Sequence, residues 1–238
     1  MAEGITIDDI AAARERGRDV VLTTPTLPST SFSRLVGADV WLKAENLQRT
    51  GSFKIRGGMN AVALLPDTAR DAGVVAASAG NHAQGVALAA AENGVPATVF
   101  MPESAAIPKI AATKEYGAEI RLAGTNLAEA TDHAKAFEAE TGAAFIHPYD
   151  DPHIVAGQGT LGMELDEQVP DLDTVIIPVG GGGLISGASV ALKAAHPGVR
   201  IVGVQSEAVP TYLTARSTGT AKEIDPRPTI ADGIAVSR

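Results

Sequence analysis

Apolar runs of strand length alternate with longer amphipathic segments through most of the chain. From residue 73 the alternation is regular, and each short apolar run is followed by a helical pattern of roughly ten to fifteen residues. Strands are predicted at residues 40–45, 74–77, 97–101, 144–146, 174–179 and 201–204, while residues 119–122 lead into a helix. Helices are predicted at residues 6–16, 83–93, 108–116 and 127–141, and after the glycines at 180–183. This alternation is typical of βαβ units, so we expect an α/β protein of the doubly wound, parallel-sheet type.

Two breaks in the alternation indicate a division into domains. They fall near Gly73 and near Pro148. They would make residues 73–148 a small domain inserted into a large domain of residues 1–72 and 149–238. The stretch between residues 146 and 174 is expected to be rich in loops.

Composition and charge narrow the classes of function. Hydrophobic residues make up 45% of the 238 residues and charged residues 20%, which is typical of a globular protein. The net charge of −9 argues against a nucleic-acid surface, because phosphate backbones are bound by clustered Lys and Arg. The chain has no cysteine, no basic and apolar leader, and no uncharged apolar run of membrane-spanning length. We therefore expect a cytoplasmic protein that contacts neither membranes nor nucleic acids.

A lysine framed by glycines is the first candidate for chemistry. Lys54 lies in residues 50–58, between Gly51 and the pair Gly57–Gly58, where a loop is expected to meet a helix. Burial there would lower the pKa of its amine and free it to form an imine with a carbonyl cofactor. If Lys54 is considered without the other motifs, a solvent-exposed side chain is the more common interpretation, because lysines are almost always exposed.

Two predicted strand-to-helix turns are candidate anion sites. Residues 78–85 could present backbone N–H groups at a helix N-terminus to a carboxylate, or could simply form a capped turn. Residues 178–187 place four glycines directly after a buried strand, an arrangement that forms a phosphate-binding nest or a flexible loop. They lack the Lys-Ser/Thr ending of a P-loop and the G-x-G-x-x-G spacing of a dinucleotide site. A Schiff-base lysine, a carboxylate turn and a phosphate nest together indicate a pyridoxal 5'-phosphate site for an amino acid.

The chain resembles the threonine dehydratase (threonine ammonia-lyase) and serine racemase family of fold-type II pyridoxal-phosphate enzymes. The similar stretches follow one another in the same order over nearly the whole chain: residues 45–57, 78–85, 147–151, 157–160, 180–187 and 229–233. The resemblance implies two doubly wound parallel-sheet domains, as in the tryptophan synthase β-like fold. It also implies a homo-oligomeric full-length protein.

The resemblance also assigns roles to individual residues. Lys54 would carry the cofactor and remove the Cα proton of the substrate, Phe53 would pack against the pyridine ring, and Asn81 would hydrogen-bond the phenolic oxygen. The cofactor phosphate would be bound by one loop, formed by Gly180, Gly181, Gly182, Gly183 and Leu184, and Gly233 would line the cofactor. The substrate carboxylate would be bound by a second loop, formed by Ser78, Ala79, Gly80, Asn81 and His82. The implied reaction removes the β-hydroxyl of L-threonine or L-serine and yields 2-oxobutanoate or pyruvate with ammonia.

Three departures from the family pattern refine this interpretation. The resemblance aligns Ala79 with the position at which serine racemases carry a serine that acts as the second base. Alanine cannot transfer a proton, so elimination is favoured over racemisation. Gln205 and Thr211 stand where metal-activated relatives carry acidic residues, so no divalent metal is expected. The chain stops soon after Gly233, whereas the family's catalytic domains continue. We therefore expect the large domain to be incomplete and the partner of the pyridine nitrogen to lie beyond Arg238.

Several alternatives remain open at this point. Within the family they are a serine racemase, a hydroxyaspartate ammonia-lyase and a β-replacing enzyme such as a cysteine synthase. From other classes they are a non-catalytic fragment that binds the cofactor, and a nucleotide-binding protein. The preference among hydroxy amino acids, feedback by isoleucine, and a biosynthetic or catabolic role are left open by the sequence.

Overall fold

The computed structural model describes residues 4–220, 222–225 and 227–237. Its strands are β1 (Thr26–Pro28), β2 (Trp41–Lys43), β3 (Val74–Ala77), β4 (Ala97–Met101), β5 (Glu119–Leu122), β6 (Ala144–Phe145), β7 (Thr174–Pro178) and β8 (Arg200–Val204). Its α-helices are α1 (Ile7–Gly17), α2 (Thr30–Val36), α3 (Lys54–Ala63), α4 (Asp67–Arg70), α5 (Asn81–Glu92), α6 (Ile107–Glu115), α7 (Leu127–Thr141), α8 (Pro152–Gln168), α9 (Gly183–Ala195) and α10 (Thr211–Thr218). Two short 3₁₀ helices are η1 (Glu45–Leu47) and η2 (Asp232–Ile234). None of the described helices is long and apolar enough to cross a membrane.

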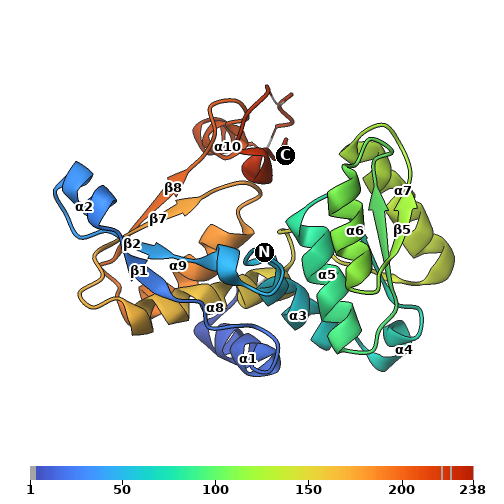
Figure 1. The fold of residues 1–238 in the computed structure, drawn as a ribbon, viewed down its shortest axis with the longest axis horizontal. Helices are drawn as coiled ribbons and strands as arrows, with labels where there is room; N and C mark the ends of the chain where they lie inside the picture. The colour runs from blue at the N-terminus through green and yellow to red at the C-terminus, as the bar shows by residue number, and fades with distance from the viewer. Residues whose placement is uncertain (1–3, 221, 226, 238) are drawn as a thin grey trace.

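The largest sheet is parallel and lies between two layers of helices. Its strand order is β5-β4-β3-β6, and β3 pairs in register with β4 from Val74 opposite Ala97. Val75, Ala77 and Phe100 pack on α7 from one face, while the side chains of the other face pack on α5 and α6. These elements form the right-hand part of the molecule in Figure 1. The doubly wound α/β fold predicted from the apolar runs is therefore confirmed.

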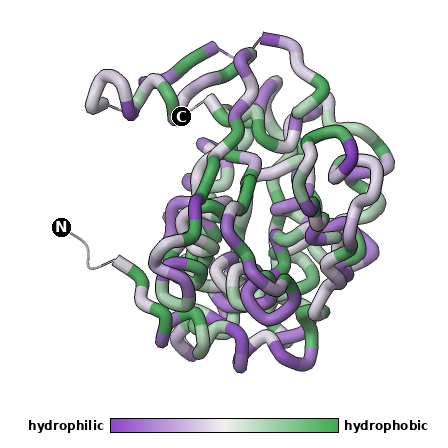
Figure 2. Tube along the Cα trace, turned by 90° about the vertical axis from the view of Figure 1, so that its left-hand side faces the viewer, coloured by the Kyte–Doolittle hydropathy of each residue, from purple (hydrophilic) through white to green (hydrophobic). Residues whose placement is uncertain are grey.

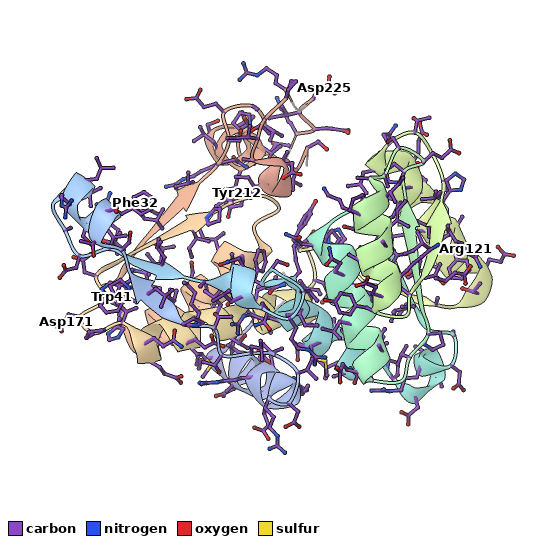
Figure 3. The ribbon with its side chains drawn as sticks, in the orientation of Figure 1. Phe32, Trp41, Arg121, Asp171, Tyr212 and Asp225 are labelled. Carbon is purple, nitrogen blue, oxygen red and sulfur yellow. The ribbon has the colours of Figure 1, made fainter. Side chains whose placement is uncertain are left out.

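A second, smaller sheet lies in the other part of the molecule. Strands β7 and β8 are parallel, and the antiparallel pair β1–β2 lies near them (Figure 1). Val175 and Ile177 of β7 pack against α8 and α9, whereas Ile176 is 68% exposed on the opposite face. Phe32 and Trp41 lie at the same outer end of the molecule, as labelled in Figure 3. The boundary of a small domain at residues 73–148 stays a prediction.

Helices α1 and α7 each bury one face, whereas α3 and α5 are buried along most of their length. Figure 2 shows short hydrophobic stretches alternating with hydrophilic ones along the coloured trace. At the start of α1, Thr6 and Asp9 form a reciprocal capping box, as expected from an N-cap threonine. The strand predicted at residues 40–45 is shorter, because the chain turns into η1 at Glu45, whose carboxylate binds a buried arginine.

The prediction of a loop-rich stretch before residue 174 was wrong. Residues 152–168 form the long helix α8, which Asp151 caps through its carboxylate and Pro152 opens. Three interior glycines obscure the helical pattern in the sequence, and all three lie where helices touch. A Cβ at Gly157 would lie 2.4 Å from the carbonyl oxygen of Arg56, and one at Gly162 would lie 2.7 Å from that of Ala188. The glycines therefore allow α8 to pack backbone to backbone against α3 and α9.

Candidate functional site

Lys54 is the first residue of α3, and its amine lies inside the protein. The helix begins without a side-chain cap, since its N-cap residue, Phe53, makes no such hydrogen bond. The Lys54 amine donates a hydrogen bond to the carbonyl oxygen of Pro148 at 2.7 Å and lies 5.4 Å from the centre of the Phe53 ring. Burial lowers the pKa of Lys54 to about 8. The predicted loop–helix junction and the predicted desolvation are both present.

The second candidate segment connects the buried strand β3 to α5. Gly80 is the N-cap of α5 and offers no side chain, so the first amides of the helix have no side-chain acceptor. His82, in the first turn, is 4% exposed, and its Nε2 lies 2.9 Å from the carbonyl oxygen of Ile146. Burial lowers the pKa of His82 to about 3, so its ring is neutral and Nε2 carries the proton that it donates. The ring thus anchors this turn to the chain after β6 and brings no positive charge to the site.

The third segment turns from β7 into α9. Gly182 has a φ of +90° and is the N-cap of α9, again without a side-chain cap. A Cβ at Gly181 would lie 2.2 Å from the ring of Tyr149, and one at Gly183 would lie 2.9 Å from the carbonyl oxygen of Tyr149. Two of the four glycines are thus required by the close approach of Tyr149. The uncapped N-terminus of α9 leaves amides for an anion.

One cavity of about 630 Å³ brings the predicted residues together. Its lining includes every residue to which the resemblance assigned a role: Phe53, Lys54, Ser78, Ala79, Gly80, Asn81, His82, Gly180, Gly181, Gly182, Gly183, Leu184 and Gly233. The volume falls within the range of small-molecule sites. The individual roles of these residues stay predictions.

The cavity suits the anionic groups of pyridoxal phosphate and of an amino acid. The N-termini of α3, α5 and α9 all reach it, and none has a side-chain cap. Helix N-termini carry partial positive charge and free amides, so three of them favour a phosphate and a carboxylate. The buried Lys54 amine has the reactivity that an imine to the cofactor requires. The residues present therefore fit the group.

Sequence reasoning gave no role to several other lining residues. Pro148, which accepts from Lys54, acts through its backbone carbonyl, and no sequence signal marks such an acceptor. The ring of Tyr149 packs edge-to-face against His147 with centroids 4.7 Å apart, and His147 Nδ1 accepts from the Asp150 amide at 2.8 Å. Gln158 of α8 is 1% exposed, and its Oε1 has no hydrogen-bond partner among the described residues. These residues belong to stretches 147–151 and 157–160, so the resemblance pointed to the segments and not to their contacts.

The positions discussed for a metal are occupied by neutral side chains. Gln205 Nε2 lies 3.1 Å from Thr211 Oγ1, so the two side chains bind each other. Within the described residues, no three His, Cys, Asp or Glu side chains gather as a candidate metal site.

Comparisons with known proteins place the chain among related sequences and structures. A family model described as "Pyridoxal-phosphate dependent enzyme" matches residues 18–238. L-threonine ammonia-lyase of Thermotoga maritima is 49% identical over 234 residues, which cover 98% of this chain and 58% of that protein. The catabolic L-threonine dehydratase of Escherichia coli is 44% identical over 234 residues, covering 98% of this chain and 71% of that protein. The chain thus spans less than two thirds of the length of the first of these relatives.

The structural comparison agrees. The structure of maize serine racemase superposes with a TM-score of 0.94 at 38% identity, covering 98% of this chain and 71% of that one. The fold-type II architecture expected from the resemblance is therefore confirmed. The family match extends over nearly all of the sequence and includes the buried lysine and both uncapped turns. The chain therefore belongs to the family of pyridoxal-phosphate dependent enzymes.

Proposed function

We propose that this chain carries out the deamination of L-threonine, and also of L-serine, by α,β-elimination of water. The products are 2-oxobutanoate from threonine and pyruvate from serine, each with one ammonia. The observation that carries the proposal is the buried amine of Lys54 in one cavity with the uncapped N-termini of α5 and α9. The names of the curated relatives at 44% and 49% identity support threonine as the substrate.

The chemistry divides between the cofactor and the protein. Pyridoxal phosphate, when bound, supplies an aldehyde that holds the substrate amine and a ring that withdraws electrons from Cα. Lys54 is the base that takes the Cα proton, since its lowered pKa leaves a useful fraction of the amine neutral near pH 7. The β-hydroxyl leaves as water, and a second water is consumed when the resulting enamine becomes the 2-oxo acid and ammonia.

The two uncapped turns bind the anionic groups. The amides that begin α9, at Gly183 and Leu184, hold the cofactor phosphate, because a helix N-terminus favours a dianion. The turn from Ser78 to Asn81 binds the substrate carboxylate in the same way. His82 positions this second turn through its bond to Ile146, and its neutral ring leaves recognition of the carboxylate to amides and hydroxyls.

A serine racemase is the second candidate, favoured by the similarity to the maize structure. Racemisation needs a proton donor on the face of the substrate opposite to Lys54. Ala79 lines the cavity in the carboxylate turn, and its methyl group cannot transfer a proton. Elimination is therefore preferred. The variant Ala79→Ser should produce D-serine from L-serine that the unmodified chain does not, measured by chiral chromatography.

The test of the main proposal is a Lys54-dependent product. The purified chain is incubated with pyridoxal phosphate and L-threonine, and 2-oxobutanoate is followed by coupled reduction with a lactate dehydrogenase. Lys54→Ala is the loss variant, and Lys114→Ala, which removes an exposed lysine of α6, is the matched control. Borohydride treatment of the loaded chain, followed by peptide mapping, identifies the lysine that carries the cofactor.

The two readouts separate failure of binding from failure of the reaction. Product and borohydride labelling at Lys54, both absent from Lys54→Ala, support the proposal. Labelling without product would support a protein that only binds the cofactor, and labelling at another lysine would refute the assignment. A cytoplasmic location and a homo-oligomeric full-length protein are part of the same proposal.

A further inference from the structure

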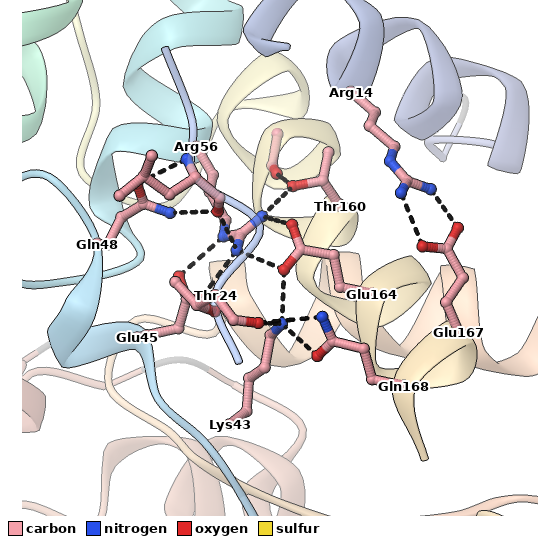
Figure 4. A network of polar contacts seen from close by, with 12 residues as sticks. Arg14, Thr24, Lys43, Glu45, Gln48, Arg56, Thr160, Glu164, Glu167 and Gln168 are labelled. Atoms are coloured by element: carbon pink, nitrogen blue, oxygen red, sulfur yellow. Dashed lines mark hydrogen bonds and ion pairs between the residues drawn. The ribbon is translucent and has the colours of Figure 1, made fainter. Parts of the chain in front are cut away.

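A buried ion cluster lies directly beside the candidate site, beneath the first turn of α3. Arg56, two residues after Lys54, has a side chain with no exposed surface. Its guanidinium makes two hydrogen bonds to Glu45, at 2.8 and 2.8 Å, and two to Glu164, at 2.6 and 2.9 Å. It also donates to Thr160 at 3.1 Å. Both carboxylates are thus held by the planar fork of one arginine, as Figure 4 shows.

A second cation balances the charges of the cluster. Lys43 of β2 donates to Glu164 at 2.5 Å, to Gln168 at 2.9 Å and to the carbonyl oxygen of Thr24 at 2.7 Å. Two cations therefore face two carboxylates. Burial alone would lower the pKa of Arg56, but its bonds to Glu45 and Glu164 outweigh this and raise the pKa, so the arginine stays charged. The cluster joins β2, η1, α3 and α8.

Stability alone is a weak explanation for such a cluster. The cost of removing charges from water offsets most of the attraction inside, so apolar side chains of similar volume often serve as well. A fixed geometry is a better attested use of buried charged groups. At the start of α3 the N-cap residue gives no side-chain cap and Ser52 Oγ accepts from the Lys54 amide at a long 3.5 Å, so the bonds of Arg56 are the shorter contacts near this end of the helix.

Helix α8 connects this cluster to the turn of residues 180–184 at the start of α9, called here the phosphate-binding turn. Glu164 of α8 holds Arg56, and Gly157 of α8 allows contact with the Arg56 carbonyl. On its other side α8 packs against α9, where a Cβ at Gly159 would lie 3.0 Å from the carbonyl oxygen of Gly187. One helix thus touches both the helix that begins at Lys54 and the helix that begins at Gly183.

We propose that Arg56 is a positioning residue that, through its paired bonds to Glu45 and Glu164, fixes the distance between the Lys54 amine and the phosphate-binding turn. The inference rests on the proposed function, since both groups are assumed to hold the same cofactor molecule. A lysine at position 56 would keep the charge but lacks the planar fork that serves two carboxylates at once.

The test compares two ligands that differ in one functional group. Pyridoxal 5'-phosphate engages the phosphate-binding turn and Lys54, whereas pyridoxine 5'-phosphate has an alcohol in place of the aldehyde and engages the turn alone. Dissociation constants of both are measured for the full chain and for Arg56→Lys by fluorescence titration. We expect affinity for pyridoxal phosphate to fall at least tenfold and affinity for pyridoxine phosphate to change less than threefold.

A second arginine that pairs with a glutamate of α8 provides a matched control. Arg14 of α1 forms a two-pronged pair with Glu167 of α8, one turn from Glu164, and both of its side-chain hydrogen bonds within the described residues go to that carboxylate (Figure 4). Arg14→Lys should leave both affinities within threefold. If Arg56→Lys does not fold, as judged by circular dichroism, Glu45→Gln supplies the same comparison with a milder loss, expected at three- to tenfold.

Each outcome bears on one proposal. Equal loss of both ligands, or no loss of either, in the folded variant overturns the positioning role and leaves the proposed function intact. Failure of the unmodified chain to bind pyridoxal phosphate more tightly than pyridoxine phosphate would instead refute the role of Lys54.

Discussion

The lowered pKa of Lys54 makes a quantitative prediction about how fast the chain captures its cofactor. The neutral amine is the nucleophile, and its fraction at pH 7 depends on burial of the side chain. With a pKa of about 8, close to a tenth of the amine is neutral at pH 7. With the solvated value of 10.5 the fraction would be about 0.03%, roughly 300-fold less. The difference of about 2.5 pKa units corresponds to about 3 kcal/mol between the two protonation states.

A pH series on the cofactor-free chain tests this prediction. The second-order rate constant for combination with pyridoxal phosphate is measured by stopped-flow absorbance from pH 7 to 11, above the second ionisation of the phosphate. Because a second-order constant reports the free protein, its inflection gives the pKa of the unliganded amine. We expect a rise of about fivefold between pH 7 and pH 8, an inflection near pH 8 and a plateau of about twice the pH 8 value above it.

Two references bracket the result. Nα-acetyl-lysine amide should rise through the whole range toward its solvated pKa, and Lys54→Ala should give no protein-dependent phase. An inflection above about pH 9.5 in the chain itself would mean that water reaches the amine, and the argument from burial would fail.

Three further predictions follow from other contacts. Lys54→Met should raise the free energy of unfolding at pH 7 by about 2–3 kcal/mol, because burying the ammonium has a cost below pH 8 that shrinks as the pH rises toward 10.5. Urea unfolding at pH 7 and pH 10 measures this gain, and an equal gain at both pH values would contradict the prediction. Gly85→Ala should lower the free energy of unfolding by about 1–3 kcal/mol, since the new Cβ would lie 3.0 Å from the backbone of Lys54. As a control, Gly198→Ala, with open space around the glycine, should change the free energy of unfolding by less than about 0.5 kcal/mol. Equal effects of the two variants would count against the close packing of α3 and α5. His82 should stay neutral from pH 5 to 8 with its proton on Nε2, and a ¹⁵N chemical shift that titrates near 6.5 would show the ring to be hydrated.

The elements that the sequence predicts best are fully buried strands and helices with clear capping residues at both ends. The runs at 74–77 and 97–101 match β3 and β4 residue for residue, because a parallel strand covered on both faces is a nearly continuous apolar run, which Thr98 alone interrupts. Helix α7 matches its predicted range of 127–141, since Asn126 caps it and Gly142 ends it in the left-handed conformation. In these cases the local sequence and the tertiary environment favour the same structure.

The site shows where sequence reasoning stops. Lys54 and the two turns could be found because glycines and short polar residues beside apolar runs carry a local signal. The partners of Lys54 and Arg56 could not, since Pro148 and Glu164 are 94 and 108 residues away and one of them acts through its carbonyl. Helix α8 was missed for the same reason. Its glycines are explained by neighbours that only the fold brings near.

The glycines of α8 also have a consequence for the order of folding. Gly157, Gly159 and Gly162 each weaken an isolated helix by about 1 kcal/mol relative to alanine, and a seventeen-residue segment is already marginal in water. A peptide of residues 152–168 should therefore be mostly coil. The helix gains its stability from docking against α1, α3 and α9, so we expect the two ends of the cavity and the helix between them to form together. A nascent chain can acquire the pocket only after α9 has been synthesised, and no earlier intermediate should retain the cofactor.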